Sequence, residues 1–510
     1  MKSRREFLEI SFAAALQAAP PGGTDSVVEA SLTSLGEGLA VSRFTSVQLV
    51  EQYLARIGEL DKGGPLLNSV IELNPDALAI AGAMDAERAA KGSRGPLHGI
   101  PILIKDNIDT ADKMMTTAGS LALAGSSAPK DAGLVLRLRD AGAILLGKTN
   151  LSEWANFRSR HSTSGWSGRG GQTRHPYALD RNPSGSSSGS AVAVAASLCA
   201  AAVGTETDGS VISPASVCGI VGIKPTVGLI PGSGIIPISH RQDTAGPMAR
   251  NVTDAALFLG VLTGASYGRA LDRRGLKGAR IGVLRQSFGF DPQVDQLMQS
   301  ALDTMKQLGA EVIDPVKFPT YSKLGDPEGQ ALRWEFKADL DAYLAARGTA
   351  VKSLAVKSLK DVIDFNERNR DREMPYFGQE TFIEAEALGP LTSRQYRSLL
   401  ERLDDLSRHN GIDKVMIDHN LDAMVGPSDG PAGLTDYAKG DRPDEGCCTP
   451  AAVAGYPHIT VPAGFVRGLP VGLSFFGSPR TEVKLIRYAF AFEQAVNARR
   501  PPEYLASVPA

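Results

Sequence analysis

Short apolar runs alternate along this chain with longer segments of helical period. Residues 99–104 and 143–146 are almost wholly apolar and of strand length, and a helical pattern at 131–141 separates them. A run that is apolar at nearly every position is typical of a strand covered on both faces, whereas strict alternation is typical of a strand with one wet face. The order strand, helix, strand therefore predicts α/β architecture around a mostly buried sheet.

The same alternation returns in the second half of the chain. Strands are expected at 280–284, 310–313, 421–425 and 459–462. Between the first two of them, Asp291-Pro292 is the start signal of a helix that ends at Leu308 before Gly309. Residues 329–413 differ because they are charged, helical in period and poor in strand signals. They are interpreted as a helical insertion in one large domain that spans about residues 25–505.

Two helices are expected before the first strand. Thr45 followed by Gln48 forms a capping box, and Asn74 is the expected N-cap of a helix over 75–90. The longest uninterrupted apolar run, residues 191–204, is interpreted as a buried core helix. That run is shorter than the ~20 apolar residues that cross a bilayer, so no membrane span is predicted.

Charge and cysteine usage exclude several functional classes. The net charge is −2 and no long Lys/Arg run occurs, which argues against a nucleic-acid partner. The four cysteines, Cys199, Cys218, Cys447 and Cys448, form neither a CxxC pair nor a metal-ligand spacing. A disulfide framework, a metal site and a cofactor are therefore not expected, although a reactive thiol at the adjacent pair stays possible.

The N-terminal residues resemble an export signal. Arg4-Arg5-Glu6-Phe7-Leu8 precedes an apolar stretch at 10–15 and small residues at 18–20. A basic start, a short apolar core and small residues are typical of a signal peptide, and the paired arginines are typical of the twin-arginine type. Residues 1–22 are therefore predicted to direct export to the periplasm; if they are only a basic terminus, the protein is cytoplasmic.

Three segments carry groups that hydrolytic chemistry uses. Lys105 ends the apolar run at 99–104, where burial would lower the pKa of its amine and make it a candidate base. Residues 182–190 bring five serines before a helix, and residues 204–210 form a turn that ends in Ser210, a candidate nucleophile. Taken alone, each has an ordinary structural explanation: a snorkelling lysine, a Ser/Gly cap and a surface turn.

Together, and in this order, the three segments resemble the amidase signature family. The matching motifs are Gly-Ile-Pro-Ile-Leu-Ile-Lys-Asp at 99–106, the serine-rich stretch at 182–190 and Gly-Thr-Glu-Thr-Asp-Gly-Ser at 204–210. Further similarity at 147–153, 222–226, 243–247 and 455–472 extends the resemblance over nearly all of the chain after about residue 30. It implies an α/β domain whose mixed, mostly buried central sheet has helices on both faces.

The resemblance also implies roles for individual residues. Ser210 would be the nucleophile, Ser187 the bridging serine held by a cis peptide bond, and Lys105 the base that draws its proton. The backbone N–H groups of Thr207, Asp208, Gly209 and Ser210 would form the oxyanion hole. The chain departs from the usual pattern at three positions: Asp208 and Ser188 in place of Gly, and Ile212 in place of Arg.

The Thr-Asp-Gly-Ser variant at 207–210 and the segments at 152–158, 164–167 and 172–173 are most similar to the bacterial peptide amidase branch. This similarity implies hydrolysis of linear carboxamides, and C-terminal peptide amides in particular, to a carboxylate and ammonia by a monomer or homodimer. Residues that would contact the substrate are Ser186, Phe157, Arg158, Trp166 and Asp208. For Phe157 and Trp166 a place in the core is an equal alternative, and Arg158 would otherwise form a structural ion pair.

Three other functions remain open from the sequence. One is the A subunit of a tRNA-dependent amidotransferase, which the predicted export signal opposes. Another is an α/β-hydrolase esterase, because Gly-Ser-Ser-Ser-Gly at 185–189 matches GxSxG and His458 offers a base. The third is an exported binding protein without turnover, which the presence of Lys105, Ser187 and Ser210 opposes.

Overall fold

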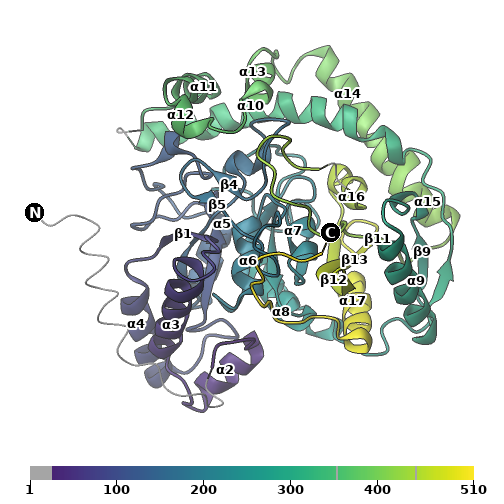
Figure 1. Cartoon of the computed structure of the whole chain (residues 1–510), viewed down its shortest axis with the longest axis horizontal. Helices are drawn as coiled ribbons and strands as arrows, with labels where there is room; N and C mark the ends of the chain where they lie inside the picture. Colours follow the sequence, from purple (N-terminus) through teal and green to yellow (C-terminus); the bar gives the residue numbers. More distant parts are fainter. Residues whose placement is uncertain (1–25, 352–353, 443–444, 510) are drawn as a thin grey trace, which may run out of the picture.

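The computed structural model describes residues 26–509 except 352–353 and 443–444. The predicted export signal at 1–22 lies outside these residues. An 11-stranded sheet runs through the centre of the molecule (Figure 1). Its strands, in order across the sheet, are β1 (Val70–Leu73), β3 (Ile144–Thr149), β2 (Pro101–Lys105), β6 (Ala202–Glu206), β8 (Thr244–Ala249), β7 (Val221–Lys224), β12 (His458–Val466), β13 (Leu469–Phe476), β11 (Ala423–Pro427), β9 (Arg280–Val283) and β10 (Glu311–Ile313).

The sheet is mixed, as expected. β2 pairs in parallel with both β3 and β6, whereas β6 pairs antiparallel with β8 and β12 pairs antiparallel with β13. Most strand residues are buried because helices flank the sheet. These helices are α2 (Leu32–Ala40), α3 (Ser46–Arg56), α4 (Ala77–Lys91), α5 (Gly133–Asp140), α6 (Ser188–Ala195), α7 (Ile212–Val217), α8 (Val252–Thr263), α9 (Pro292–Gln307), α16 (Cys448–Ala454) and α17 (Glu482–Val496).

The sequence motifs that predicted helix starts are confirmed for α3 (Ser46–Arg56) and α9 (Pro292–Gln307) but not for α4 (Ala77–Lys91). Thr45 and Gln48 form the complete capping box of α3, and Asp291 caps α9 through the N–H groups of Gln293 and Val294. Helix α4 begins at Ala77 with Asp76 as its N-cap residue, so Asn74 is not the N-cap as expected. The Asn74 side-chain oxygen accepts the Asp76 N–H at 3.0 Å, while its NH2 group donates to the Leu145 carbonyl of β3 at 2.8 Å.

The interpretation of residues 191–204 as one helix is wrong. Helix α6 ends at Ala195, Ser197 has a φ of 54°, and β6 starts at Ala202. A short, wholly apolar run suits a buried strand and a buried helix equally, so the pattern alone could not place the break. In the part of the chain that the structure describes, no helix is long and apolar enough to cross a membrane.

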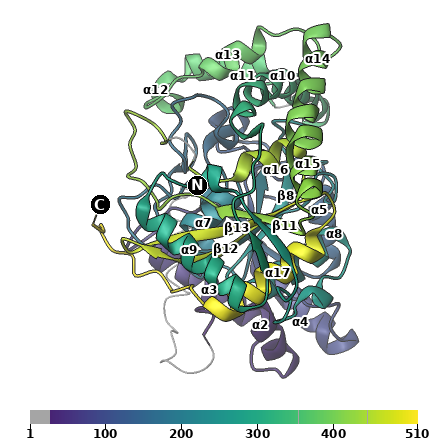
Figure 2. The same cartoon turned by 90° about the vertical axis from the view of Figure 1, so that its right-hand side faces the viewer.

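A helical layer lies between β10 and β11 in the sequence and forms the green arc at the top of Figure 1. Figure 2 shows that it stands beyond one end of the sheet strands. Apolar side chains of this layer pack with Trp154 and Ala155 of the central domain in a second core cluster. Its elements are α10 (Gly325–Ala350), α11 (Leu359–Arg368), α12 (Arg370–Glu373), α13 (Glu380–Glu386), α14 (Arg394–Asp404), η7 (Asp405–Ile412) and α15 (Asp413–Asp418), and they are called the helical insertion below.

Candidate active site

Lys105 is the last residue of β2, and its side chain is fully buried. Its amine donates to the Ser186 hydroxyl at 2.8 Å, to the Ser187 hydroxyl at 3.0 Å and to Thr205 Oγ1 at 2.9 Å. Burial lowers the pKa of Lys105 to about 7, against the opposing influence of the Asp243 and Glu206 carboxylates. A large share of the amine is therefore neutral near pH 7 and able to accept a proton.

The serine-rich stretch folds into a loop that leads into α6. The peptide bond between Gly185 and Ser186 is cis. The N–H of Ser187 donates to the Ser210 carbonyl at 3.1 Å, which joins this loop to the turn that carries Ser210. Ser186 and Ser187 are both fully buried. The structure thus brings the three predicted segments together, although they lie far apart along the chain.

Ser187 occupies a different place from the one expected. Its hydroxyl accepts the N–H of Thr205 at 3.1 Å and donates to the Thr205 carbonyl at 3.0 Å, so both backbone groups of one β6 residue engage it. The cis bond precedes Ser186, not Ser187. The expectation that the cis bond precedes Ser187 is therefore wrong. Ser186 follows that bond, and its hydroxyl accepts from Lys105 without the bonds to β6 that hold Ser187.

The turn at 204–210 is held by a buried carboxylate. Glu206 ends β6, and its Oε2 accepts the N–H groups of Val211 at 2.8 Å and Ile212 at 3.0 Å. Gly209 has a φ of 72°, a conformation that favours glycine and lets the chain reverse directly before Ser210. Helix α7 begins two residues later at Ile212. Ser210 is therefore presented on a short connection fixed between a strand and a helix.

Ser210 opens onto a cavity of about 580 Å³. Its walls come from the 155–157 and 182–185 segments, from the turn at 207–210 and from the 429–442 loop. Residues that line it are Ala155, Asn156, Phe157, Ser164, Asn182, Ser184, Gly185, Thr207, Asp208, Ser210, Val217, Ile238, Leu332, Asp429, Ala432, Gly433, Leu434, Asp436, Lys439, Gly440, Asp441 and Arg442. Leu332 belongs to α10, so the helical insertion contributes to this cavity.

Comparison with known proteins decides the family. A family model described as Amidase matches residues 48–486. The chain belongs to the amidase signature family. A probable amidase of Arabidopsis thaliana is 42% identical over 508 residues, which cover 95% of this chain and 93% of the relative. The X-ray structure of native peptide amidase from Stenotrophomonas maltophilia is 46% identical, with a TM-score of 0.88, and the match covers 94% of this chain and 99% of that one.

A second group of relatives belongs to the same family. The A subunit of glutamyl-tRNA(Gln) amidotransferase from Methylobacillus flagellatus is 33% identical, and the match covers 94% of this chain and 100% of the relative. The chain is thus an amidase signature enzyme that hydrolyses amide C–N bonds. Membership of this family establishes that the bond cleaved is an amide C–N bond.

Two of the predicted substrate contacts lie behind the cavity wall. Arg158 is fully buried and pairs with Glu153 at 2.8 Å, so it forms the structural ion pair that was the alternative. Trp166 packs against the ring of Phe377 with centroids 5.2 Å apart and does not line the cavity. Phe157 does line it. The fold therefore removes Arg158 and Trp166 from the set of residues that can touch a substrate. Ser186 is fully buried beside Lys105.

Asp208 lines the cavity, but its carboxylate has a structural partner. Thr449 in α16 donates its hydroxyl to Asp208 Oδ2 at 2.7 Å. The departure from Gly at this position thus anchors the turn to a helix from near the C-terminus. Cys448 lies on the same side, since a Cβ atom at Gly209 would come within 3.7 Å of its sulfur. Burial raises the pKa of the Cys448 thiol well above its ordinary value, so it is not an activated thiolate.

The esterase interpretation does not fit the structure. His458 is fully buried on β12, and its Nε2 lies 2.5 Å from the Ser474 hydroxyl. Burial lowers the pKa of His458 to about 3. The Lys105 amine donates to the Ser187 hydroxyl at 3.0 Å. In the described part of the chain no group of His, Cys, Asp and Glu side chains could hold a metal ion.

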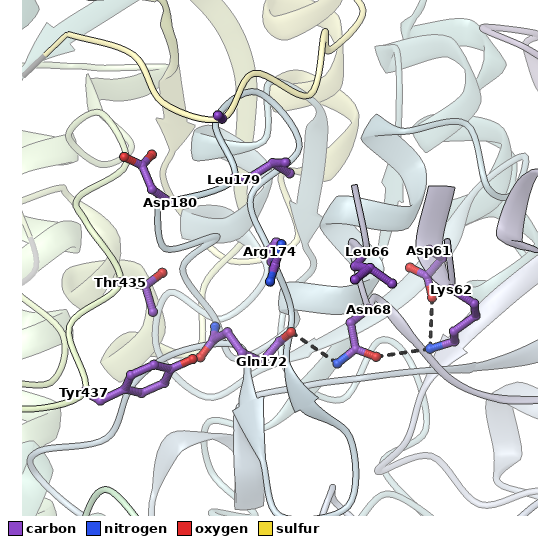
Figure 3. Close-up of a pocket in the computed structure, with 11 residues that line it drawn as sticks. Asp61, Lys62, Leu66, Asn68, Gln172, Arg174, Leu179, Asp180, Thr435 and Tyr437 are labelled. Carbon is purple, nitrogen blue, oxygen red and sulfur yellow. Dashed lines mark hydrogen bonds and ion pairs between the residues drawn. The ribbon is translucent and has the colours of Figure 1, made fainter. Parts of the chain in front are cut away.

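A second cavity of about 830 Å³ is lined in part by residues of the 434–441 segment (Figure 3). Thr435 and Tyr437 face it, whereas Leu434 and Asp436 line the cavity of Ser210. Its floor is a polar network in which Lys62 donates to the Asn68 side chain at 3.1 Å. This cavity contains neither Lys105 nor a serine and is not the candidate active site.

Several site residues had no signal in the sequence. Asp429, Lys439 and Arg442 line the cavity from a loop without local periodicity or motif. Glu206 stood inside a recognised motif, but its role as the holder of the turn follows only from its two hydrogen bonds. A carboxylate at the end of a buried strand was the one available hint, since such a group must find donors inside the protein.

Proposed function

We propose that this amidase removes the terminal carboxamide of peptides, releasing ammonia, with Ser210 as nucleophile, Ser186 as bridging serine and Lys105 as base. The observation that carries the chemistry is the buried Lys105 amine, with a pKa of about 7, hydrogen-bonded to Ser186 beneath the cavity that Ser210 opens onto. The similarity to the peptide amidase of Stenotrophomonas maltophilia supports the substrate class.

The proposed reaction starts with proton movement away from Ser210. A serine hydroxyl is a poor nucleophile until a neighbouring base accepts its proton. Here the proton passes from Ser210 to Ser186 and from Ser186 to the neutral amine of Lys105, while Ser210 Oγ bonds to the amide carbon. The carbonyl oxygen becomes an oxyanion, and the N–H groups of residues 207–210 stabilise it.

Collapse of this intermediate needs the same proton again. An amide nitrogen leaves poorly as an anion, so Lys105 returns the proton through Ser186 to the nitrogen and ammonia departs. Water then attacks the ester carbon on Ser210 by the same route and releases the carboxylate. A relay that both removes and returns one proton suits amides better than a base that only removes it.

The A subunit of a tRNA-dependent amidotransferase is the second candidate. The similarity to the corresponding protein of Methylobacillus flagellatus favours it. That function requires partner proteins, so co-purification of such partners with the full chain would support it. A chain that is pure, alone and active on peptide amides would support the peptide amidase proposal instead.

Ammonia release tests the proposed function directly. The wild-type protein is incubated with peptide amides, aryl amides and short aliphatic amides, with Ser210→Ala as the blank. Peptide amides are expected to react fastest, and Ser210→Ala is expected to lose at least about 10⁴-fold in kcat because the nucleophile is absent. Equal activity of Ser210→Ala, or preference for a short aliphatic amide, would contradict the proposal.

The pH dependence of hydrolysis follows from the state of Lys105. Only the neutral amine accepts a proton, and its pKa is about 7. We therefore expect kcat/KM to fall as pH drops below that value and to level off above it, which a profile from about pH 5 to pH 9 would show. A profile that stays flat through neutrality, or that falls as pH rises, would remove Lys105 as the base.

A further inference from the structure

The wall of the cavity next to Phe157 is a turn of left-handed backbone. Trp154 has φ 52° and ψ 37°, Ala155 has φ 53° and ψ 35°, and Asn156 has a φ of 73°. Three consecutive residues other than glycine rarely adopt this conformation, because the Cβ atom comes close to the following carbonyl oxygen. Such a turn persists only where its surroundings hold it. Ala155 and Asn156 are also cavity residues, so the turn shapes the site.

An ion pair spans this turn. Glu153 precedes it and Arg158 follows it, and Arg158 Nη1 lies 2.8 Å from Glu153 Oε1. Both side chains are completely shielded from solvent. Glu153 Oε2 also accepts the N–H of Gly168 at 2.6 Å, and the guanidinium carbon of Arg158 lies 4.4 Å from the ring centroid of Phe377. The two ends of the turn are thus joined to each other and to the chain around them.

Glu373 connects the same cluster to the helical insertion. It is the last residue of α12, and its backbone carbonyl accepts a hydrogen bond from Arg158 Nη1. Its Oε1 accepts the N–H of Leu121 at 2.7 Å. The carboxyls of Glu373 and Glu153 converge, since a Cβ at Gly168 would lie 2.7 Å from Glu373 Oε2 and 2.9 Å from Glu153 Oε2. Burial raises the pKa of both carboxyls.

Aromatic contacts from the insertion cover the outer side of the turn. Trp154 meets the ring of Phe382 in α13 edge-on, with centroids 5.9 Å apart. Phe157 packs against Phe336 in α10 at 5.0 Å. The insertion therefore contacts the turn and the residues that flank it through the rings of Phe336 and Phe382 and through the buried Glu373. The turn also lines the cavity, through Ala155 and Asn156.

We propose that Glu153, Arg158 and Glu373 are positioning residues that hold the left-handed turn as a rigid wall of the substrate cavity, so that the helical insertion controls which amides fit. None of the three touches the substrate. The inference rests on the proposed function only in taking this cavity as the amide site. It assigns the insertion a role in substrate selection rather than in the chemical step.

Kinetics of Glu373→Ala would test this role with the amide that the wild type turns over fastest. The variant is expected to raise KM about 10-fold while kcat stays within about 3-fold, because the wall moves but the nucleophile does not. Glu373→Gln retains the shape of the side chain and an oxygen that accepts the Leu121 N–H, and it is expected to restore most of the loss. Asp364→Ala, which removes an exposed ion pair on α11 of the same insertion, is the matched control.

A glycine in the turn separates positioning from general stability. Ala155→Gly makes the left-handed conformation accessible without the Cβ clash, so the turn depends less on its supports. The effect of Glu373→Ala on KM is therefore expected to be several-fold smaller in the Ala155→Gly background than in the wild type. If Glu373→Ala does not fold, Arg158→Lys replaces it in the same comparison.

Two outcomes would overturn the inference. One is a Glu373→Ala variant with unchanged KM and unchanged ranking of amides, even if its Tm is lower. The other is an equal effect of Glu373→Ala in both backgrounds. Neither depends on peptide amides being the preferred substrates, because failure of that preference changes only which amide is used in the comparison.

Discussion

Lys105→Ala is expected to lower kcat about 10²- to 10⁴-fold, the range that a positioned general base contributes. The amine contacts both candidate relay serines and Thr205 from a fully buried position at the end of β2. Without it, the proton of Ser210 has no acceptor inside the protein. Steady-state kinetics with the best amide would measure the loss, with circular dichroism to confirm that the variant folds.

Lys105→Arg is the informative companion variant. It keeps a positive charge and several donors, but a guanidinium does not release its proton in the accessible pH range. If Lys105 acts as a base, the arginine variant should be nearly as impaired as the alanine variant. Substantial activity in Lys105→Arg would show that the site needs only a cation, and the proton relay would then have to be abandoned.

Ser186→Ala is expected mainly to lower activity, and Ser187→Ala is expected mainly to lower stability. Ser186→Ala removes the proposed bridge and should lower kcat by about 10²-fold or more, with little change in the free energy of unfolding. Ser187→Ala leaves the buried N–H and carbonyl of Thr205 without their side-chain partner, which should cost about 1–3 kcal/mol of stability. It should retain more activity than Ser186→Ala.

Denaturant unfolding and kinetics on both variants give a direct comparison. Each replacement removes one hydroxyl from adjacent buried positions, so each serves as the other's control. The reversed order, with Ser187→Ala the less active and Ser186→Ala the less stable, would return the bridging role to Ser187. That result would mean that the hydroxyls exchange partners once a substrate is bound.

Much of the fold was predictable because its strands are buried on both faces. The apolar runs at 99–104 and 459–462 are strands β2 and β12, and the start of α9 at Asp291-Pro292 is confirmed. The predictions failed where one pattern suits two structures. Residues 191–204 contain the end of α6 and the start of β6, and α4 begins at Ala77 rather than directly after Asn74.

Some residues of the candidate site could likewise be predicted from the sequence, and others could not. Lys105 and Ser210 could be chosen from the sequence because the three motifs occur together in the order of the amidase signature family, whereas each alone has an ordinary structural explanation. The cavity wall could not be chosen, because it is assembled from segments near residues 156, 208 and 436 and from Leu332 of α10, which no local pattern connects. Arg158 is an example. The sequence made it a candidate for substrate binding, but the structure shows that its side chain is fully buried and paired with Glu153.

The sequence by itself determined that a lysine would end a buried strand, that a serine would end a reversing turn and that both belong to an amidase signature chain. Only the tertiary structure distinguished the two serines between them in the proposed relay, because Ser186 and Ser187 are adjacent and chemically identical. Both hydroxyls accept from Lys105, which lies 81 residues from Ser186 and 82 residues from Ser187 in the sequence. Packing directs the Ser187 hydroxyl also to the backbone of Thr205 in β6 and leaves that of Ser186 without these two bonds.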